Sequence, residues 1–491
     1  MKKILQKVIC VAMISVMALP FAACGNKGES WSTETTETEE ETVLDPDVTT
    51  ITFAVPDYCH VDDLYLKLFN KELINDGHKY QLKISSFEYD FEDNKYFKNI
   101  ENELNSGNVD VAFLGMGDED NNVYKLINSG AVLILDEIIS SDKGKALYDA
   151  FPSALWETVR CNGHIYSIPQ ANLNDQGVYA AFNTDYIDAQ AIENWDGSID
   201  GIYKMIKSVK WDDKAAPRFQ YLISDYDFEK IIRCEIRNGL LYDYDTMKIE
   251  NPLESEKLIN YFKVLEKMKS DGYLSKSVSY YQNTAYSDEE ANLTSGKFLA
   301  LLSLGEPDDY LQKDNICIKK LTPYLRSRIN TSIGISSNTK KLDAVLDFLG
   351  LFYGDAKYGN ILLYGRQDKD YMLKDGFAVY MDGTDIPYEF TTKLSLGLFV
   401  NTHPVKGENY TVNRKEEYFA FYKNAVASPF KGFEEDSTGY GSVNEDLNGF
   451  LSSLNQNSLD VAVKDYSAKL KSDGIDEYLN SVKKQWETFN K

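Results

Sequence analysis

The chain has 491 residues, of which 77 are acidic and 52 are basic, and its formal net charge at pH 7 is −25. This charge excludes nucleic acid as a partner, because no basic stripe could offset the repulsion from a phosphate backbone. The length exceeds what a single hydrophobic core sustains, so at least two domains are expected.

The first 23 residues have the features of a targeting segment. Lys2, Lys3 and Lys7 precede an apolar run over 8–23, which is shorter than the ~20 residues needed to cross a bilayer. The run leads into Phe-Ala-Ala-Cys-Gly (21–25), which resembles the cleavage site of a bacterial lipoprotein signal. This resemblance implies a signal peptide over 1–23 and a lipid (palmitate) on Cys24, which anchors the protein to the outer face of the cytoplasmic membrane. Ordinary secretion after cleavage at Ala23 is the alternative.

Residues 24–47 are rich in Ser, Thr and Glu and have low complexity. Such a stretch cannot bury enough apolar surface to fold. It is predicted to be a disordered tether that holds a folded body away from the membrane.

The folded body begins with alternating strand and helix patterns. Strands are predicted near 51–55, 80–84 and 109–114, with helices near 64–69 and 97–104 between them. This order predicts a mostly parallel sheet with helices on both faces. Because ligands bind at the carboxyl ends of such strands, loops 56–59 and 115–118 are candidate site segments.

The later patterns are less regular until the chain's last helices. Residues 298–304 form another apolar strand pattern that Gly305 stops. The stretch 365–441 is interpreted as hairpins and irregular structure, with turn signals at Asp375-Gly376 and Asp382-Gly383. Helical periodicity returns over 459–470 and, after Gly474, over 475–489.

Four cysteines follow the tether, and none forms a Cys-x-x-Cys pair: Cys59, Cys161, Cys234 and Cys317. Their wide spacing argues against a local zinc site. An extracytoplasmic location permits disulfides, while isolated buried thiols are an equal alternative. No metal, cofactor or redox role is predicted.

Several stretches, in chain order, resemble the extracellular solute-binding proteins of carbohydrate ABC importers (family 1 type). They are 104–111 (LNSGNVDV), 126–136 (LINSGAVLILD), 162–169 (NGHIYSIP), 178–186 (VYAAFNTDY), 296–300 (GKFLA) and 334–339 (GISSNT) with the helix pattern 344–352. A narrower similarity is to a larger lipoprotein subgroup with an extended C-terminal region, through 428–433 (SPFKGF), 473–477 and 485–486. Together these motifs cover most of the chain after the tether.

The resemblance implies the two-lobed α/β fold of periplasmic binding proteins (type II). Each lobe is a mostly parallel sheet flanked by helices, and hinge strands join the lobes. Applied to this sequence, lobe 1 is 48–176 plus 323–364, and lobe 2 is 177–322 plus 365–491. A monomer that closes on its ligand and is then read by the permease subunits of the importer is the implied mechanism.

The loops expected to face the cleft contain aromatic and polar side chains suited to sugar rings and hydroxyls. The candidate ligand-binding residues are Asp57, Tyr58, Met116, Asp118, Gln170, Asn172, Tyr179, Glu306 and Arg366. For each of them the alternative is a solvated loop residue or, for the tyrosines, a core ring. Trp156, Trp195 and Trp211 are weaker candidates, since tryptophans of this kind are more often buried structure.

Other functions were weighed against sugar binding. An enzyme is not expected: Gly-x-Ser-x-Gly, His-Glu-x-x-His and P-loop motifs are absent from the sequence. An extracellular sensor on the same scaffold, or a binder of another polar solute such as a peptide, remains an alternative. The acidic loop 118–121 could hold calcium, but it lacks the glycine and distal glutamate of an EF-hand loop.

Overall fold

The computed structural model describes residues 44–89, 95–116, 122–170, 177–211, 218–223, 225–274, 297–305, 307, 311, 313–325, 331–407 and 413–491. Residues 1–43, with the predicted signal and most of the tether, lie outside this description, as do Cys24, Asp118, Asn172, Glu306 and the acidic loop 118–121. Of Met116, only the backbone is described. No helix of the described residues is long and apolar enough to span a bilayer.

The first sheet has five strands in the order β2-β1-β3-β15-β6. Its strands are β1 (Thr49–Pro56), β2 (Tyr80–Phe87), β3 (Val111–Met116), β15 (Thr331–Ile335) and β6 (Ile168–Pro169). β1 is central and parallel to β2 and β3, while β15 is antiparallel to both β3 and β6. Only β15 therefore runs against the other four strands, in agreement with the predicted mostly parallel sheet.

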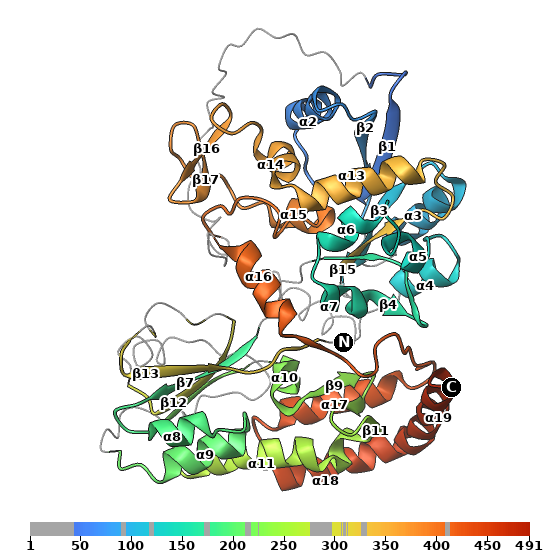
Figure 1. Ribbon diagram of the computed structural model, residues 1–491. Helices are drawn as coiled ribbons and strands as arrows, with labels where there is room; N and C mark the ends of the chain where they lie inside the picture. The colour runs from blue at the N-terminus through green and yellow to red at the C-terminus, as the bar shows by residue number, and fades with distance from the viewer. Residues whose placement is uncertain are drawn as a thin grey trace, which may run out of the picture. The chain divides into compact units, whose positions relative to one another are not determined.

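The helices of this part contact the strands of the sheet, except the last of them in chain order, which packs mainly on two of the others. They are α2 (Asp63–Asn75), α3 (Lys95–Ser106), α4 (Asn122–Asn128), α13 (Leu342–Gly354) and α14 (Ala356–Tyr364). In α3 the buried residues Tyr96, Ile100 and Leu104 recur at helical spacing. Figure 1 shows α13 lying over β1 and β3. Shorter elements complete this part: α5 (Asp136–Ile139), α6 (Lys145–Asp149), α7 (Ser153–Trp156), η1 (Glu157–Val159), β4 (Arg160–Cys161) and β5 (His164–Ile165).

The second sheet has four strands in the order β13-β7-β12-β8. They are β7 (Val178–Asn183), β8 (Phe219–Leu222), β12 (Ala300–Leu304) and β13 (Ile316–Lys320). β12 is parallel to β8, and β7 is antiparallel to β12 and β13, so again one strand opposes the rest. The reversed strands are β15 in the first sheet and β7 in the second. Each is the first strand of its sheet that the chain forms after leaving the other sheet.

A three-stranded sheet and several helices extend the second core. The sheet comprises β9 (Cys234–Arg237), β10 (Leu240–Asp243) and β11 (Lys248–Glu250). The helices are α8 (Ala189–Glu193), α9 (Ile199–Lys207), η2 (Asp225–Asp227), α10 (Phe228–Ile232), η3 (Pro252–Glu254), α11 (Glu256–Ser270), α17 (Gly441–Ser453), α18 (Leu459–Ser472) and α19 (Ile475–Phe489). Figure 1 shows α17 and α18 beside α11.

Two large hydrophobic clusters form the cores of these two parts. The first core joins buried residues of 51–168, 325–362 and 394–422, and the second joins those of 178–302 and 430–482. The chain passes between them at three places, after β6, after β13 and near residue 426. The short strands β14 (Tyr324–Leu325) and β18 (Val426–Ala427) pair in parallel at two of these places. β14 lies at the predicted return to lobe 1 near residue 323, whereas β18 lies about sixty residues after the predicted last crossing at 365.

The stretch 365–425 differs from its predicted assignment to the second lobe. Leu394, Leu396, Leu398 and Tyr422 are buried in the first core, and 364–405 includes a small cluster of its own. The predicted hairpin at Asp375-Gly376 is present as β16 (Tyr371–Lys374) and β17 (Phe377–Tyr380). The helices α15 (Phe390–Leu396) and α16 (Arg414–Lys423) were not predicted. Their apolar side chains pack on the first core, which moves the third crossing to about residue 426.

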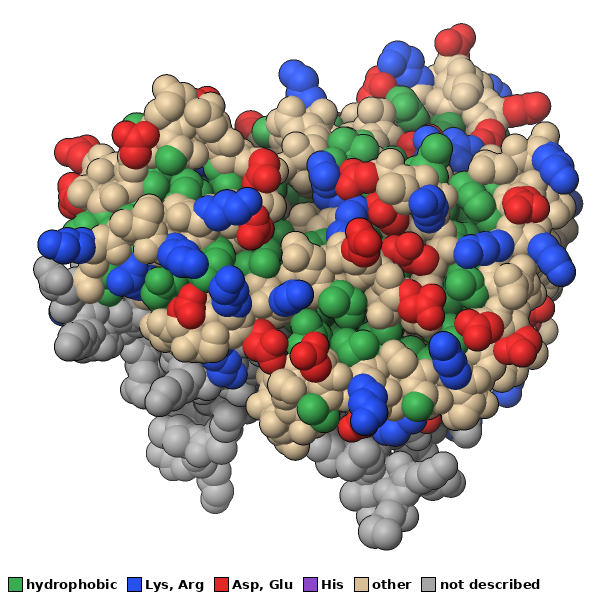
Figure 2. All heavy atoms as spheres, turned by 90° about the horizontal axis from the view of Figure 1, so that it is seen from below, with side chains coloured by type: hydrophobic (Ala, Val, Ile, Leu, Met, Phe, Trp, Pro, Cys, Tyr) green, Lys and Arg blue, Asp and Glu red, His purple; other side chains and the backbone are tan. Residues whose placement is uncertain are grey.

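The cysteines and the surface charges resolve two questions left open by the sequence. None of the four described cysteines is paired in a disulfide with another described residue, and three of them are buried. Figure 2 shows one face of the molecule, on which acidic and basic side chains are mixed and apolar side chains form only small patches. Despite the net charge of −25, neither sign forms a continuous stripe over the described residues on this face.

Candidate ligand-binding site

The carboxyl ends of β1, β3 and β6 meet at one edge of the first sheet, because these strands run in the same direction. Asp57 and Tyr58 follow β1, as expected, and Gln170 follows β6. The Asp57 N–H donates to the Phe87 carbonyl (2.9 Å), and the Asp57 carboxylate accepts from the Tyr89 N–H (3.2 Å). Asp57 thus connects the loops that follow β1 and β2.

Tyr58 and Gln170 are both shielded at this edge. The Tyr58 ring packs edge-on against the Tyr89 ring, with centroids 5.2 Å apart. Burial and the neighbouring Tyr89 raise the pKa of the Tyr58 phenol, which therefore stays protonated. The Gln170 side chain is 3% exposed, and neither end of its amide has a hydrogen-bond partner among the described residues. An amide in this state offers two donors and an acceptor to a polar ligand.

The other predicted residues lie elsewhere. Tyr179 belongs to β7 of the second sheet, where it is 2% exposed and packs with Phe298 and Leu301. Arg366 follows α14 and forms a local ion pair with Asp370 (Nε to Oδ2, 2.9 Å). The structure therefore brings Asp57, Tyr58 and Gln170 to one sheet edge and separates Tyr179 and Arg366 from it.

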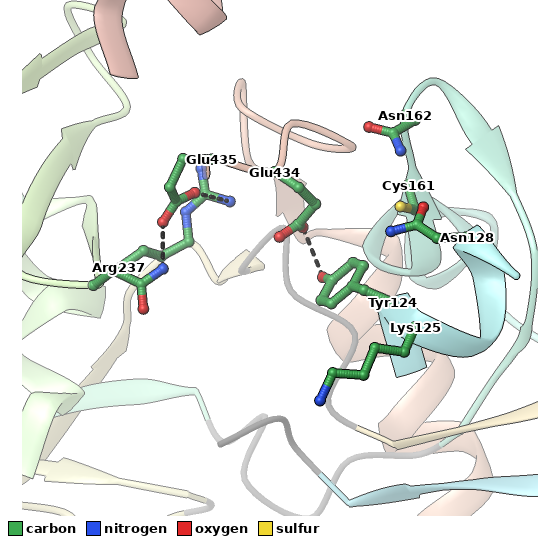
Figure 3. A pocket seen from close by; sticks show the side chains of 9 residues that line it. Tyr124, Lys125, Asn128, Cys161, Asn162, Arg237, Glu434 and Glu435 are labelled. Carbon is green, nitrogen blue, oxygen red and sulfur yellow. Dashed lines mark hydrogen bonds and ion pairs between the residues drawn. The ribbon is translucent and has the colours of Figure 1, made fainter. Parts of the chain in front are cut away.

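A second polar region, which was not predicted from the sequence, is a cavity of about 190 Å³. It is lined by Tyr124, Lys125, Asn128, Cys161, Asn162, Arg237, Asn238, Glu434 and Glu435. Figure 3 shows Tyr124, Asn128 and Cys161 on one side, Arg237 and Glu435 on the other, and Glu434 between them. The first group comes from α4 and the β4–β5 hairpin, and the second from the β9–β10 hairpin and the segment 434–435.

Two Asn-Gly turns present backbone and amide groups to this cavity. Asn162 and Gly163 join β4 to β5, and Asn238 and Gly239 join β9 to β10. All four residues have positive φ, between 46° and 85°, as a two-residue type I′ turn requires. Asn-Gly dipeptides signal such turns in a sequence, so this signal could have identified both hairpins. It could not have shown that they line one cavity.

Direct hydrogen bonds hold the carboxylates of the cavity. The Tyr124 hydroxyl donates to Glu434 Oε1 (2.6 Å), and Asn238 Nδ2 donates to Glu435 Oε1 (2.8 Å). Arg237 Nη1 donates to the Phe433 carbonyl (2.7 Å) and lies 3.5 Å from Glu435 Oε2. The guanidinium also stacks on the Tyr242 ring, 4.1 Å from its centroid.

Burial controls the ionisation of this region. The side chains of Arg237 and Glu435 are 3% and 1% exposed. Burial alone would lower the pKa of Arg237, but the nearby Glu435 and Tyr242 have a larger opposite effect. The pKa of Arg237 is therefore raised well above its ordinary value. Burial, assisted by the charge of Glu434, raises the pKa of the Cys161 thiol to about 12. Cys161 therefore stays protonated at neutral pH and supplies no thiolate.

The segment 428–436 crosses between the β4–β5 hairpin and α19. The Asn162 N–H donates to the Gly432 carbonyl (2.8 Å), and Lys431 pairs with Glu157 (2.7 Å). Phe430 and Phe433 pack against Trp486, with ring centroids 4.9 and 5.1 Å away. The two C-terminal stretches that carry the narrower sequence resemblance are thus in direct contact.

Asp136 stabilises, through hydrogen bonds, the β4–β5 hairpin on which Cys161 and Asn162 lie. Its carboxylate accepts from the Ile165 N–H (2.9 Å) and from Arg160 Nη1 (3.0 Å). Burial opposes ionisation of Asp136, but these two hydrogen bonds and the charge of Arg160 lower its pKa below the usual 3.8. The ionised form is therefore favoured more strongly in the folded than in the unfolded state.

The Asp136 contribution to stability should depend on pH. Because its folded pKa is depressed, the contribution is present above pH 3.8 and is lost as the pH falls through the folded pKa. We expect Asp136→Asn to cost about 1 kcal/mol near neutral pH and progressively less below pH 3.8. Urea unfolding across this range checks it. Asp149→Asn, at an exposed i,i+4 pair with Lys145, is the control, and an Asp136→Asn cost that does not change with pH would contradict the prediction.

Among the described residues, no group of three or more His, Cys, Asp and Glu side chains is arranged to hold a metal ion. The polar groups gathered at the two regions are amides, carboxylates, phenols, a guanidinium, an ammonium group and a thiol. These groups suit the binding of uncharged polar molecules.

Comparison with known proteins identifies the fold. No family model and no curated protein sequence matches the chain. The N-glycan transport solute binding protein (NgtS) of Streptococcus pneumoniae is 22% identical, with 90% of this chain and 99% of that chain covered and a TM-score of 0.57. A family 1 extracellular solute-binding protein from Alicyclobacillus acidocaldarius is 14% identical (87% and 99% covered, TM-score 0.49). The S. pneumoniae substrate binding protein FusA, in complex with kestose, is 13% identical (90% and 99% covered, TM-score 0.47).

The likeness to NgtS spans nearly the whole of both chains, and in this chain it covers both sheets and both cores described above. The chain therefore has the two-lobed α/β fold of type II periplasmic binding proteins.

Proposed function

We propose that the protein is an extracellular solute-binding protein that captures a sugar or oligosaccharide and delivers it to an ABC importer. The observation that supports this most is the structural likeness to NgtS over 90% of this chain, because the solved protein is described as a transport protein for N-glycans. A ligand that contacts both lobes stabilises the closed form by its differential affinity.

The chemistry of the two polar regions supports a carbohydrate ligand. Aromatic rings such as Tyr58 and Tyr89 suit the apolar face of a sugar ring. The buried amide of Gln170 and the amides of Asn128 and Asn162 suit its hydroxyl groups. A protein that binds and releases its ligand needs no reacting group, and we propose that this one is not an enzyme.

The location and partners belong to the same proposal. The segment 21–25, which resembles the cleavage site of a bacterial lipoprotein signal, supports a lipid anchor on Cys24 at the extracellular face of the cytoplasmic membrane. The acidic, low-complexity 24–47 then acts as a tether. The protein works as a monomer whose protein partners are the permease subunits of the importer, with no nucleic acid involved.

A thermal-denaturation screen of the chain without residues 1–23 tests the function. The ligands are neutral oligosaccharides, acidic oligosaccharides, peptides and calcium. An oligosaccharide at about a hundred times its Kd is expected to add about 2.7 kcal/mol of stability. Tm would rise by roughly 3 °C, and the sugar would be recovered intact. Stabilisation by peptides alone, or cleavage of the sugar, would overturn the proposal.

A further inference from the structure

The cavity beside Arg237 contains buried hydrogen-bonding groups with no partner. Arg237 Nε and Nη2 and Glu435 Oε2 have none among the described residues, although both side chains are more than nine-tenths buried. Their mutual approach of 3.5 Å, between Nη1 and Oε2, is an ion pair without a hydrogen bond. Buried charged groups left in this state are costly, so something in solution should complete them.

The unpartnered atoms restrict what can complete them. Two are donors and one is an acceptor, so the completing group must both donate and accept. An anion would be attracted by Arg237 but repelled by Glu434 and Glu435. A cation would be attracted by the two glutamates but repelled by Arg237. A hydroxyl group does both. The charged residues that line the cavity are also balanced, with Lys125 and Arg237 against Glu434 and Glu435, which favours a neutral ligand.

We propose that this cavity is a subsite for one neutral sugar ring, held through its hydroxyl groups. The inference rests on the proposed function and deepens it, since it makes the ligand a neutral oligosaccharide rather than an acidic one. Arg237 and Glu435 bind the ring from the second core, Asn162 and Tyr124 bind it from the opposite side, and Glu434 lies between the two groups (Figure 3). A cavity of about 190 Å³ accommodates one ring but not a chain of rings.

Water is the competing occupant, because a few water molecules could also complete Arg237 and Glu435. Blocking the cavity distinguishes the two. Asn128 lines the cavity from an exposed position on α4, so an indole at this position can fill the space without disturbing either core. Ser129 is the next residue, is also exposed and lies outside the lining, so Ser129→Trp is the control.

The experiment measures Kd by calorimetry for the neutral oligosaccharide that gives the largest shift in the thermal screen. Asn128→Trp is expected to weaken binding at least about tenfold, and Ser129→Trp to leave it within about twofold. In a second variant, Glu434→Gln, one negative charge is lost. The ratio of affinities for an acidic over a neutral oligosaccharide of equal length should then rise by about fivefold or more.

The outcomes separate this inference from the proposed function. If the unmodified protein binds a neutral oligosaccharide and Asn128→Trp binds it equally well, water occupies the cavity, and the subsite is overturned while the function stands. A preference of the unmodified protein for acidic oligosaccharides would likewise overturn the subsite alone. If no sugar in the screen binds, the function and the subsite both fail.

Discussion

Replacing Asp110 by alanine is expected to lower the free energy of unfolding by about 3 kcal/mol. Asp110 is completely buried at the start of β3. Its carboxylate accepts from the Thr52 N–H (2.9 Å), the Thr339 hydroxyl (2.7 Å) and Lys341 Nζ (2.9 Å). These three partners come from β1 and from the segment that joins β15 to α13, so one carboxylate connects three parts of the first core.

Urea unfolding of the purified variant measures this effect, with the midpoint and slope fitted separately. Asp343→Ala is the control, since Asp343 pairs with Lys143 at the surface with 74% of its side chain exposed, and a loss below about 0.5 kcal/mol is expected there. Equal losses for the two variants would show that the buried network contributes no more than a surface pair. Asp110 lies in the motif 104–111 that resembles solute-binding proteins. Its three hydrogen bonds give a structural reason for an aspartate at this position of the motif.

The strands and helices of the first sheet could be predicted because their patterns are local. Apolar runs and alternation over 51–55, 80–84 and 109–114 correspond to β1, β2 and β3, with boundaries within a few residues. The last two helices were recognisable for the same reason. Gly474 separates them at φ 84°, a conformation that glycine adopts without a Cβ penalty.

The stretch 365–425 could not be assigned because its structure depends on distant contacts. α15 has the sequence FTTKLSL, with β-branched residues that disfavour a helix, yet Thr392 to Leu396 are all buried. Its contacts with β1 and β3 determine its structure, and they become visible only when 390–396 and 51–116 are placed together. The domain boundary at residue 365 was misplaced for this reason.

The candidate site was predictable only in part. Asp57 and Tyr58 directly follow β1 and lie at the expected sheet edge, because strand direction determines where they lie. Gln170 reaches the same edge through the short strand β6. The cavity instead combines α4, two hairpin turns and the segment 434–435, which are separated by up to about three hundred positions in the sequence. No local pattern reports such a combination.

Removal of the buried cation at this cavity should have the other large effect on stability. Arg237→Met is expected to cost about 3–5 kcal/mol, because it leaves the Glu435 carboxylate buried without its cation and also removes the hydrogen bond to the Phe433 carbonyl. Methionine retains much of the apolar contact with the Tyr242 ring, so the loss reports mainly the charge and its hydrogen bonds.

A double-mutant cycle with Glu435→Gln isolates the pair. If the attraction between Arg237 and Glu435 dominates, the double variant should be more stable than the sum of the single losses predicts, by about 1–3 kcal/mol. Arg233→Met, at an ion pair with 49% and 35% exposed side chains whose Asp245 keeps Lys257 as a second partner, is the matched control and should lose less than about 0.5 kcal/mol. Strictly additive losses would mean that each group is stabilised by its other neighbours. Arg237 would then be held by the Phe433 carbonyl and Glu435 by Asn238, and both would remain available to a ligand.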